Sequence, residues 1–244
     1  MKKVSIITTT YNDSAALRAT IAQIKAQDYP NIEYIIVDGA SKDDTMEVIR
    51  EAAEYFGERL IWISEKDKGI YDAINKGLKL ATGDYIGLCF DRFASNDVIS
   101  KMVAIMEKEG TDGVHGDLNY MDGEKIVRKW RNGRGNIRTG WMPGHPTLYL
   151  KKEVYETYGL YKTDYRISAD YEYMIRILKD GKVKLSYIPE VLIKMAHGGT
   201  STNSLGAYLE GMKEGHRALK ENGVKFAFVT DLLRILRVLK QFVM

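Results

Sequence analysis

The segment Val4-Ser5-Ile6-Ile7-Thr8-Thr9-Thr10-Tyr11-Asn12 decides the fold, because a β-branched run ends in a group of polar residues. A helical pattern follows from about Ser14 to Gln27, with apolar residues at the spacing of one helix face. The alternation continues, with strands expected over residues 33–37, 60–63 and 85–90 and helices after Ser41 and over 70–81. Such alternation favours parallel pairing through right-handed crossovers. We therefore expect an open α/β sheet, mostly parallel and flanked by helices.

Composition limits the classes of protein to which the chain can belong. Its 244 residues carry 36 basic and 33 acidic side chains, a formal net charge of +3, which does not support nucleic-acid binding through a global field. The single cysteine, Cys89, excludes an internal disulfide and fits a reducing compartment. The first apolar run is too short for a signal peptide, and no stretch approaches the ~20 apolar residues of a membrane span. The sequence therefore predicts a cytoplasmic location.

Polar residues follow the ends of the predicted strands, where ligands bind in open α/β sheets. Hydroxyls and a tyrosine ring can hold a base and ribose, a carboxylate can accept a nucleobase N–H, and a Lys at a helix start can meet a phosphate. Each also has a plainer interpretation, as a helix cap, a turn aspartate or a solvated charged loop. The candidate nucleotide-binding residues are Thr8, Thr10, Tyr11, Asn12, Asp38, Ser41, Asp67 and Lys68, and Asn75 is a candidate for contact with a sugar.

The pattern changes after about Val98, and this change divides the chain. We expect an antiparallel pair across a turn at Asp122-Gly123, helices over 151–158 and 169–178, and two strands near 183–187 and 191–194. The predicted domain spans 1–200, with a nucleotide-sugar-binding half (1–97) and an acceptor-binding half (98–200), and a helical appendage occupies 201–244. Acceptor specificity is expected in the second half, whose residues 119–145 are rich in loops.

Four blocks in the first half resemble the family 2 glycosyltransferases in order and spacing. The first block is the segment quoted above. The other three are Ile36-Val37-Asp38-Gly39-Ala40-Ser41-Lys42-Asp43-Asp44-Thr45, Asp67-Lys68-Gly69-Ile70-Tyr71-Asp72-Ala73-Ile74-Asn75-Lys76-Gly77 and Ala81-Thr82-Gly83-Asp84-Tyr85-Ile86. The match continues in the second half with Trp141-Met142-Pro143-Gly144-His145-Pro146-Thr147 and Ser168-Ala169-Asp170-Tyr171-Glu172. The chain looks most like the bacterial polysaccharide-building, single-domain branch. The resemblance implies a GT-A fold, a nucleotide-sugar donor that is often UDP-linked, and inversion at the anomeric carbon. It also implies nucleotide contacts by Thr10, Tyr11, Asp38 and Asp67.

The resemblance implies further roles in the second half of the chain. Asp170 stands at the position of the family's acceptor-side acid and would be the general base, because one inverting displacement needs one carboxylate to deprotonate the acceptor hydroxyl. Trp141 and His145 would lie beside the acceptor or the donor sugar. The plainer alternatives are an aspartate that stabilises a helix start and a packed, hydrogen-bonded histidine.

A divalent metal, Mn²⁺ or Mg²⁺, is the expected cofactor, because a diphosphate leaving group needs a cation to neutralise its developing charge. The family's acidic metal motif is altered here and reads Cys89-Phe90-Asp91-Arg92. Asp91 is the ligand carried over, and His197 is the candidate for a second ligand, although a lone histidine is more commonly structural. Arg92 is an alternative group for neutralising the diphosphate.

The segment 226–243 has the pattern of a basic amphipathic helix, with apolar residues at helical spacing and Arg234, Arg237 and Lys240 between them. Such a helix can lie on an anionic membrane surface, or pack on its own domain or on a second subunit. The expected partners are a nucleotide-sugar donor, a glycan or lipid-linked acceptor, and either the inner membrane face or a second copy of the chain. Nucleic acid is not among them.

The leading hypothesis is an inverting glycosyltransferase of the hexosyltransferase class that acts in cell-surface polysaccharide synthesis. A rival hypothesis is a sugar-nucleotide-binding protein with weak or no catalysis, motivated by the altered motif at Asp91. A nucleotidyltransferase is disfavoured, because the sequence lacks a Gly-rich basic phosphate loop near its N-terminus.

Overall fold

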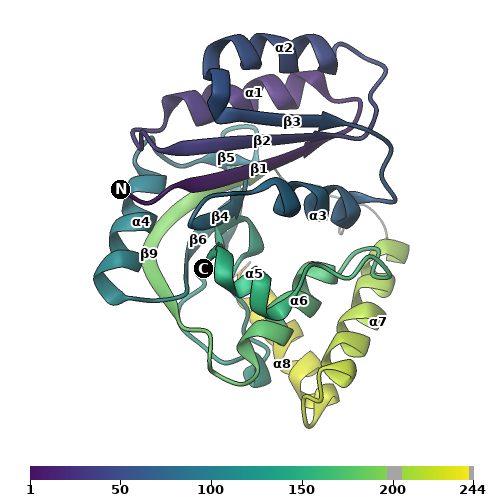
Figure 1. Ribbon diagram of the computed structural model, residues 1–244. Helices are drawn as coiled ribbons and strands as arrows, with labels where there is room; N and C mark the ends of the chain where they lie inside the picture. The colour runs from purple at the N-terminus through teal and green to yellow at the C-terminus, as the bar shows by residue number, and fades with distance from the viewer. Residues whose placement is uncertain (197–204, 242–244) are drawn as a thin grey trace.

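The computed structural model describes residues 1–196 and 205–241, which form a mixed β-sheet flanked by helices (Figure 1). The strands described pair in one nine-stranded sheet, in the order β3-β2-β1-β4-β8-β6-β9-β5, with β7 paired to β6. The strands are β1 (Val4–Thr10), β2 (Ile32–Asp38), β3 (Leu60–Ser64), β4 (Tyr85–Leu88), β5 (Arg92–Phe93), β6 (Gly113–Asp122), β7 (Lys125–Trp130), β8 (Tyr149–Lys151) and β9 (Leu185–Ala196). The helices are α1 (Ser14–Ala26), α2 (Thr45–Phe56), α3 (Ile70–Leu80), α4 (Val98–Glu109), α5 (Lys152–Tyr158), α6 (Ala169–Leu178), α7 (Leu205–Glu221) and α8 (Ala227–Lys240), with 3-10 turns η1 (Gly57–Arg59), η2 (Ile137–Thr139) and η3 (His145–Thr147).

The predicted α/β sheet is confirmed, but the strand direction varies across it. β1 to β4 run parallel, as predicted, and β6 runs parallel to β9. β8 is antiparallel to β4 and β6, β5 is antiparallel to β9, and β7 is antiparallel to β6. The mostly parallel arrangement therefore holds in the first half, whereas the second half is mixed because the β6–β7 hairpin and β8 reverse the chain.

Side chains that alternate along β1 pack against helices on opposite faces of the sheet. Ile6 lies in the core that contains α1 and α2, whereas Ile7 lies in the core that contains α3. Gly77 permits the close approach of α3, because a Cβ at this position would lie 2.5 Å from Cγ2 of Ile7. This layering places the start of α3 at the carboxyl edge of β1 and β2 (Figure 1).

The two strands predicted near 183–187 and 191–194 are one strand, β9, with an irregularity in its middle. Gly116 of β6 is paired with Ile188, but the next residue, Asp117, is paired with Val191. Pro189 and Glu190 are thus extra residues in the ladder, and a proline has no N–H to donate to a neighbouring strand. The break in the sequence pattern marks a bulge rather than the end of a strand.

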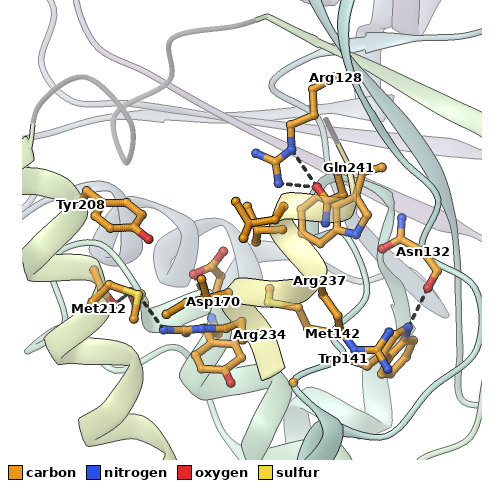
Figure 2. Close-up of a pocket in the computed structure, with 18 of the residues that line it drawn as sticks. Arg128, Asn132, Trp141, Met142, Asp170, Tyr208, Met212, Arg234, Arg237 and Gln241 are labelled. Atoms are coloured by element: carbon orange, nitrogen blue, oxygen red, sulfur yellow. Dashed lines mark hydrogen bonds between the residues drawn. The ribbon is translucent and has the colours of Figure 1, made fainter. Parts of the chain in front are cut away.

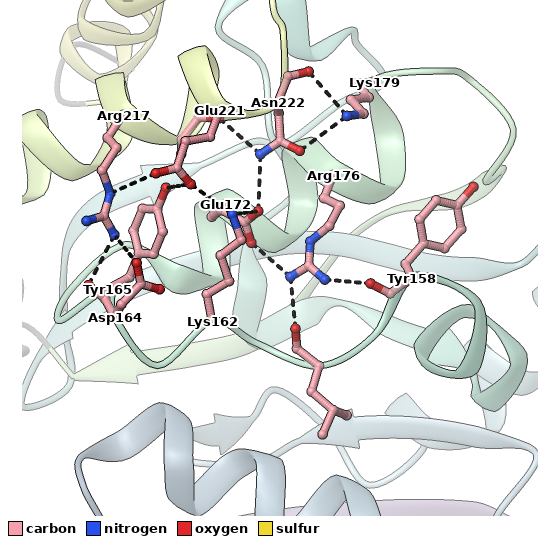
Figure 3. Close-up of polar contacts among 12 residues, drawn as sticks. Tyr158, Lys162, Asp164, Tyr165, Glu172, Arg176, Lys179, Arg217, Glu221 and Asn222 are labelled. Atoms are coloured by element: carbon pink, nitrogen blue, oxygen red, sulfur yellow. Dashed lines mark hydrogen bonds and ion pairs between the residues drawn. The ribbon is translucent and has the colours of Figure 1, made fainter.

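The C-terminal helices α7 and α8 pack on the second half of the chain, α7 against α6 and α8 against η2 (Figure 1). Figure 3 shows the polar contacts that join α6 to α7 and to the residues that follow α7. Glu172 of α6 is fully buried, and its carboxylate accepts hydrogen bonds from Arg176 at 2.8 Å and from Asn222 at 3.1 Å. Lys162 completes the network, with Nζ 3.2 Å from Glu172 and 2.8 Å from Glu221. Removing one partner of such buried charges is costly, so this network holds α7 against α6.

Two expectations about domains and the membrane bear on these helices. The division into a domain over 1–200 and an appendage over 201–244 stays a prediction. Within the described ranges, no helix is both long enough and apolar enough to cross a membrane.

Candidate active site

A cavity of about 900 Å³ opens at the carboxyl ends of β1 and β2 and at the start of α3, and we call it the strand-end cavity. This is the sheet edge where the sequence predicted a ligand. Its lining includes Thr8, Thr9, Thr10, Tyr11, Gly39, Ala40, Lys42, Lys66, Asp67, Gly69, Ile70, Ala73 and Phe90.

Tyr11 and Asp67 present their side chains at this cavity, with Gly39 between them. Tyr11 is 63% exposed, so the face of its ring is available for stacking. Oδ1 of Asp67 accepts a hydrogen bond from the N–H of Gly69 at 2.9 Å. A Cβ at Gly39 would lie 2.8 Å from Oδ2 of Asp67 and 3.1 Å from Cδ2 of Tyr11, so glycine is required for this close approach. The structure therefore brings Tyr11 and Asp67 together, although they are far apart in the sequence.

Asp38, Ser41 and Asn12 build the rim of the cavity by bonding to one another. Asp38 is fully buried, and its carboxylate accepts hydrogen bonds from the hydroxyls of Ser41 at 2.5 Å and Ser64 at 2.6 Å. The N–H of Asn12 donates to Oγ of Ser41 at 2.7 Å, and Oδ1 of Asn12 accepts from the N–H of Lys42 at 2.7 Å. Asn12 has a positive φ angle of 49°, an uncommon conformation for a residue other than glycine. These side chains hold two loops together, which differs from the open nucleotide contacts expected from the sequence.

Two other predicted contacts, those of Thr8 and Asn75, are also used inside the protein. The hydroxyl of Thr8 is buried and donates to the carbonyl of Cys89 at 2.8 Å. Asn75 is buried on α3, where its amide donates to the carbonyl of Tyr161 at 2.8 Å and accepts from the N–H of Tyr161 at 3.0 Å. Both groups of the Asn75 amide are thus satisfied by the backbone, so the expected contact with a sugar is not supported.

The lysines of the cavity differ from the one that the sequence predicted. Lys68 is exposed and is not part of the lining. Lys42 and Lys66 do line the cavity, although neither was predicted as a site residue. A lysine in a polar loop has the same local pattern whether or not it faces a cavity, so the sequence offered no signal to separate them.

Asp170 lies in the first turn of α6, with its side chain 27% exposed. Its Oδ1 accepts a hydrogen bond from the backbone N–H of the next residue, Tyr171, at 2.8 Å. The same oxygen accepts one from the hydroxyl of Tyr71 on α3 at 3.3 Å. Tyr71 belongs to α3, whose residues Ile70 and Ala73 line the strand-end cavity. The carboxylate is therefore connected to the cavity by one side chain.

His145 and Trp141 lie on the same side of the protein as Asp170. Nδ1 of His145 is 3.9 Å from Oδ2 of Asp170, and its Nε2 is 2.9 Å from the hydroxyl of Tyr161. Burial lowers the pKa of His145, and the charge of Asp170 opposes that shift. Trp141 is buried, and its indole N–H donates to the carbonyl of Asn132 at 2.8 Å. His145 is thus placed beside the candidate base, and Trp141 supports the adjoining wall.

Glu214 of α7 fixes the loop that precedes Asp170. Its buried carboxylate accepts hydrogen bonds from three consecutive backbone N–H groups, those of Arg166 at 2.6 Å, Ile167 at 2.9 Å and Ser168 at 2.8 Å. Sequence reasoning missed this residue, because an acidic residue on a charged helix has the same local pattern as a solvent-facing one.

A second cavity, of about 510 Å³, contains Asp170 and lies between α6, α7, α8 and the end of β7; we call it the α8 cavity (Figure 2). Figure 2 shows Asp170, Tyr208 and Met212 around it, with side chains of α8 forming one wall. The C-terminal end of α8 is tied to β7, where Nε of Arg128 donates to Oε1 of Gln241 at 2.7 Å. The two cavities have no described lining residue in common, and Tyr71 connects them.

Asp91 follows β4, and the N–H of Ala196 donates to its Oδ1 at 3.3 Å. Burial raises the pKa of Asp91 to about 6, so a nearby cation would favour its ionised form. Cys89 is buried, and its thiol points to the backbone carbonyl of Asp91. The guanidinium of Arg92 pairs with Glu124 at 3.2 Å. His197 lies outside the described residues, and among those described no three His, Cys, Asp or Glu side chains form a group able to hold a metal.

Tyr120 of β6 packs beside the guanidinium of Arg128. Burial raises the pKa of Tyr120, the guanidinium of Arg128 opposes the shift, and the carboxylates of Asp91 and Asp170 add to it. The Arg128 guanidinium lies 4.5 Å from the centre of the Tyr120 ring. The charges of Asp91 and Asp170 therefore both act on Tyr120.

Solved structures with the same architecture are glycosyltransferases. The chain is similar to S. aureus TarS 1–349, with a TM-score of 0.72 and 14% identity over 96% of this chain and 71% of that one. It is equally similar to the mannosyltransferase PcManGT from Pyrobaculum calidifontis, solved in complex with GDP-Man and Mn²⁺, with a TM-score of 0.72 and 18% identity over 97% of this chain and 71% of that one. The protein therefore has the GT-A glycosyltransferase fold, as predicted.

The sequence comparison identifies the family. The model described as glycosyl transferase family 2 matches residues 5–166, and the chain belongs to that family. A PGL/p-HBAD biosynthesis glycosyltransferase from Mycobacterium bovis (strain BCG / Pasteur 1173P2) is 29% identical over 209 residues, which cover 82% of this chain and 79% of the relative. The putative glycosyltransferase EpsE from Bacillus subtilis (strain 168) is 29% identical over 194 residues, covering 73% and 68% respectively.

Proposed function

We propose that the protein transfers a sugar from a nucleoside-diphosphate donor, a UDP-sugar, to a glycan or lipid-linked acceptor, with inversion at the anomeric carbon. The observation that carries this proposal is the position of Asp170, partly exposed in the α8 cavity and bonded through Tyr71 to the helix that begins at the strand-end cavity. The donor would occupy the strand-end cavity and the acceptor the α8 cavity.

The strand-end cavity has groups suited to each part of the donor. The exposed Tyr11 ring offers a stacking face for the base, and Thr10 and Asp67 offer groups for the ribose. Lys42 and Lys66 bring positive charge to the lining, where a diphosphate would need it. TarS 1–349, which shares the fold, has been solved in complex with UDP-GlcNAc, and this supports a UDP-sugar as the donor.

Asp38, Asn12 and Ser41 contribute to donor binding indirectly. Their hydrogen bonds to one another fix the two loops that present Tyr11 and Lys42 at the cavity. A preformed arrangement of this kind lowers the entropy that is lost when a ligand binds. We therefore assign these three residues to the shape of the donor site.

Asp170 would act as the general base in a single displacement. Its carboxylate accepts the proton of the acceptor hydroxyl while that oxygen bonds to the anomeric carbon, and the bond from this carbon to the diphosphate oxygen breaks. The electron pair leaves with the diphosphate. The hydrogen bonds from Tyr71 and from the N–H of Tyr171 orient the carboxylate, and Oδ2 would receive the proton.

Asp91 is the residue that would hold a divalent cation, together with oxygens of the donor diphosphate. A cation there would neutralise charge on the leaving group. The raised pKa of Asp91 fits such a role, because a carboxylate without a close cation is costly to ionise when buried. The Mn²⁺ that accompanies GDP-Man in the PcManGT complex supports the same cofactor.

The biological role that fits this activity is cell-surface polysaccharide synthesis at the cytoplasmic face of the inner membrane. The names of the relatives support a glycosyltransferase, and the exposed apolar side chains of α8 support contact with a membrane or a second copy. The hexosyltransferase class and the two-part domain division, with 201–244 as an appendage, belong to the same proposal.

A sugar-nucleotide-binding protein without catalysis is the second candidate, because Asp91 is the sole carboxylate in the altered motif Cys89-Phe90-Asp91-Arg92. The test is calorimetric titration with UDP, with and without Mn²⁺, combined with UDP release from a panel of UDP-sugars. We expect Mn²⁺ to tighten UDP binding, and Asp170→Asn to abolish transfer while UDP still binds. UDP binding without sugar release by the unmodified protein would favour the second candidate, and equal activity of Asp170→Asn would exclude Asp170 as the base.

A further inference from the structure

The α8 cavity carries more positive than negative charge. Its described lining contains five basic side chains and one carboxylate, that of Asp170. The basic residues are Arg128, Lys129, Arg131, Arg234 and Arg237. Carboxylates outside the lining pair with two of them, Asp231 with Arg234 at 3.5 Å and Asp117 with Arg131 at 3.8 Å. Basic groups remain in excess, and an acceptor made only of neutral sugars gives no reason for this, because neutral hydroxyls do not need guanidinium groups.

Two of these arginines are held by oxygens at the cavity wall. Arg237 donates from Nε to the carbonyl of Thr139 at 2.9 Å and from Nη2 to its hydroxyl at 3.2 Å. Arg131 donates to Oδ1 of Asn119 at 2.9 Å, and a carboxylate oxygen of Asp117 is 3.8 Å from its Nε. These contacts orient both guanidinium groups. Among the described residues a carboxylate lies beside Arg131 but none is paired with Arg237, so the charge of Arg237 remains available to a ligand. A planar guanidinium binds phosphate oxygens in pairs, which suits it to such a ligand.

Much of the rest of the wall is apolar. Met142, Met212, Ile235, Val238 and Leu239 line the same cavity as the arginines (Figure 2). Methionine side chains adapt to irregular apolar ligands, because they are unbranched and polarisable. The cavity therefore combines anion-binding groups with a surface for hydrocarbon.

An exposed apolar row on α8 continues from this cavity. Leu239 lines the cavity and is 56% exposed, and Leu236 and Leu232 follow along the helix at 48% and 50% exposed. Phe228 is 75% exposed at the start of the row. One helix thus lines the acceptor cavity with arginines and presents a row of large apolar side chains outside it.

We propose that the acceptor is a phosphate-bearing lipid taken directly from an anionic bilayer, with its phosphate at Arg131 and Arg237 and the exposed row of α8 in the membrane surface. This inference rests on the proposed function and names its acceptor. The apolar tail stays in the bilayer along Leu239, Leu236 and Leu232, and the sugar or hydroxyl end reaches Asp170. The lipid need not leave the membrane to react.

The charge around the row favours a bilayer over a second copy of the chain. The groove between α7 and α8, beside the row, is lined by Lys213, Arg217 and Lys220, with Glu221 and Asp231 as its acidic residues. Arg217 is paired with Asp164 and Glu221, so the exposed Lys213 and Lys220 carry the positive charge of this groove. In a twofold dimer these lysines would be brought together, and like charges repel. An anionic membrane surface attracts the same charges, at about 1 kcal/mol for each Lys or Arg near it.

The experiment is vesicle co-sedimentation of the full chain. The vesicles are phosphatidylcholine alone, phosphatidylcholine with phosphatidylglycerol, and phosphatidylcholine with a polyprenyl phosphate, the last two matched in surface charge. We expect weak binding to the first, binding to the second and tighter binding to the third.

Substitutions of Arg237 test the phosphate contact. Arg237→Gln should weaken binding to the polyprenyl phosphate vesicles by about fivefold, the factor equivalent to one lost cation at the surface, and should weaken binding to the phosphatidylglycerol vesicles less. Arg237→Lys should retain more of the preference. Arg18→Gln, an exposed arginine on α1, is the matched control.

Substitutions on the apolar row test the membrane contact separately. Leu236→Glu and Phe228→Glu should each abolish binding to both charged vesicles, whereas Tyr55→Glu, at a position that is 54% exposed on α2, should not. Thermal unfolding of each variant verifies that it is folded, and two row variants keep the test valid if one is not.

Three results would overturn the inference. The first is equal binding of the protein to the two kinds of charged vesicle. The second is an equal loss of binding to both kinds of charged vesicle in Arg237→Gln. The third is a dimer, seen by analytical ultracentrifugation, that Leu236→Glu dissociates without loss of vesicle binding. Calorimetric titration with UDP in the absence of vesicles tests the donor site independently of the lipid. Its failure would remove the donor chemistry, whereas a failure confined to the vesicle experiments would remove only the lipid acceptor.

Discussion

The hydroxyl of Tyr71 lies 3.3 Å from Oδ1 of Asp170, a contact between residues 99 positions apart in the chain. The same hydroxyl lies 2.6 Å from the carbonyl of Ile167. Tyr71 therefore joins the helix that starts at the strand-end cavity to the loop and carboxylate of the α8 cavity. Any shift of α3 on donor binding would be transmitted to the candidate base through this side chain.

Replacing Tyr71 with Phe removes this link and keeps the ring. We expect a loss of about 1 kcal/mol in the free energy of unfolding, because one buried hydrogen bond disappears. We also expect kcat to fall roughly tenfold, since Asp170 loses an orienting donor, while the Kd for UDP is unchanged. Urea unfolding, steady-state kinetics and UDP calorimetry measure these three quantities. An unchanged kcat would show that the hydrogen bond does not orient the base.

Replacing Glu214 with Gln tests whether α7 positions the loop before Asp170. The neutral amide accepts hydrogen bonds more weakly than a carboxylate and adds donors that the three facing N–H groups cannot accept. We expect a loss of about 1–3 kcal/mol in the free energy of unfolding and a fall in kcat larger than any change in the donor KM. The control is Glu210→Gln on the same helix, at an exposed position. A change in KM alone would contradict a positioning role.

Replacing Gly39 with Ala tests the strand-end cavity as the donor site. The new Cβ would lie 2.8 Å from Oδ2 of Asp67, so Asp67 or Tyr11 must move. We expect UDP binding to weaken by about tenfold, equivalent to about 1.4 kcal/mol, without loss of the fold. Calorimetric titration provides the measurement. Gly57→Ala is a control for the loss of a glycine, because no atom lies within 4 Å of a Cβ placed there. The positive φ of 57° at this position makes that variant less stable.

The stability of the protein should fall in acid because of His115. Burial lowers the pKa of His115 to about 4, and the charge of Arg134 acts in the same direction. The unfolded chain takes up this proton near pH 6.5, so between about 6.5 and about 4 it binds more protons than the folded state. The free energy of unfolding should therefore decrease as the pH falls through this range, by up to about 3 kcal/mol, and this contribution should level off below it.

Urea unfolding between about pH 7 and about pH 4 measures the effect, and His115→Phe is the comparison. The imidazole packs against Trp141 and Tyr187 at ring-centre distances of 5.5 and 5.2 Å, and a phenyl ring can make similar contacts. The variant should show a shallower decrease in stability with acid. Identical slopes for the two proteins would assign the acid sensitivity to other groups.

The candidate site could be predicted in part, and the wrong predictions of individual contacts have one cause. The edge of the sheet follows from a local feature, namely polar residues after a β-branched run, and the candidate base follows from the resemblance to the family. The hydrogen-bond partners of each polar side chain do not follow from local features. Asn75 faces the backbone of Tyr161, 86 positions away, and Asp38 is closed off by Ser64, 26 positions away. The partners of a side chain are set by long-range packing, which the spacing of residues does not record.

By itself the sequence determined the parallel strands of the first half, the sheet edge that carries the strand-end cavity, and the family, because each of these is written in short-range patterns of apolar and polar residues. The tertiary structure alone decided which polar groups stay open, such as Tyr11 and Asp67, and which hold the loops, such as Asp38. It also decided that Glu214 and Tyr71 support the loop and carboxylate of the candidate base. The physical reason is that a buried polar group must be hydrogen-bonded, and its partner comes from whatever segment the fold packs beside it.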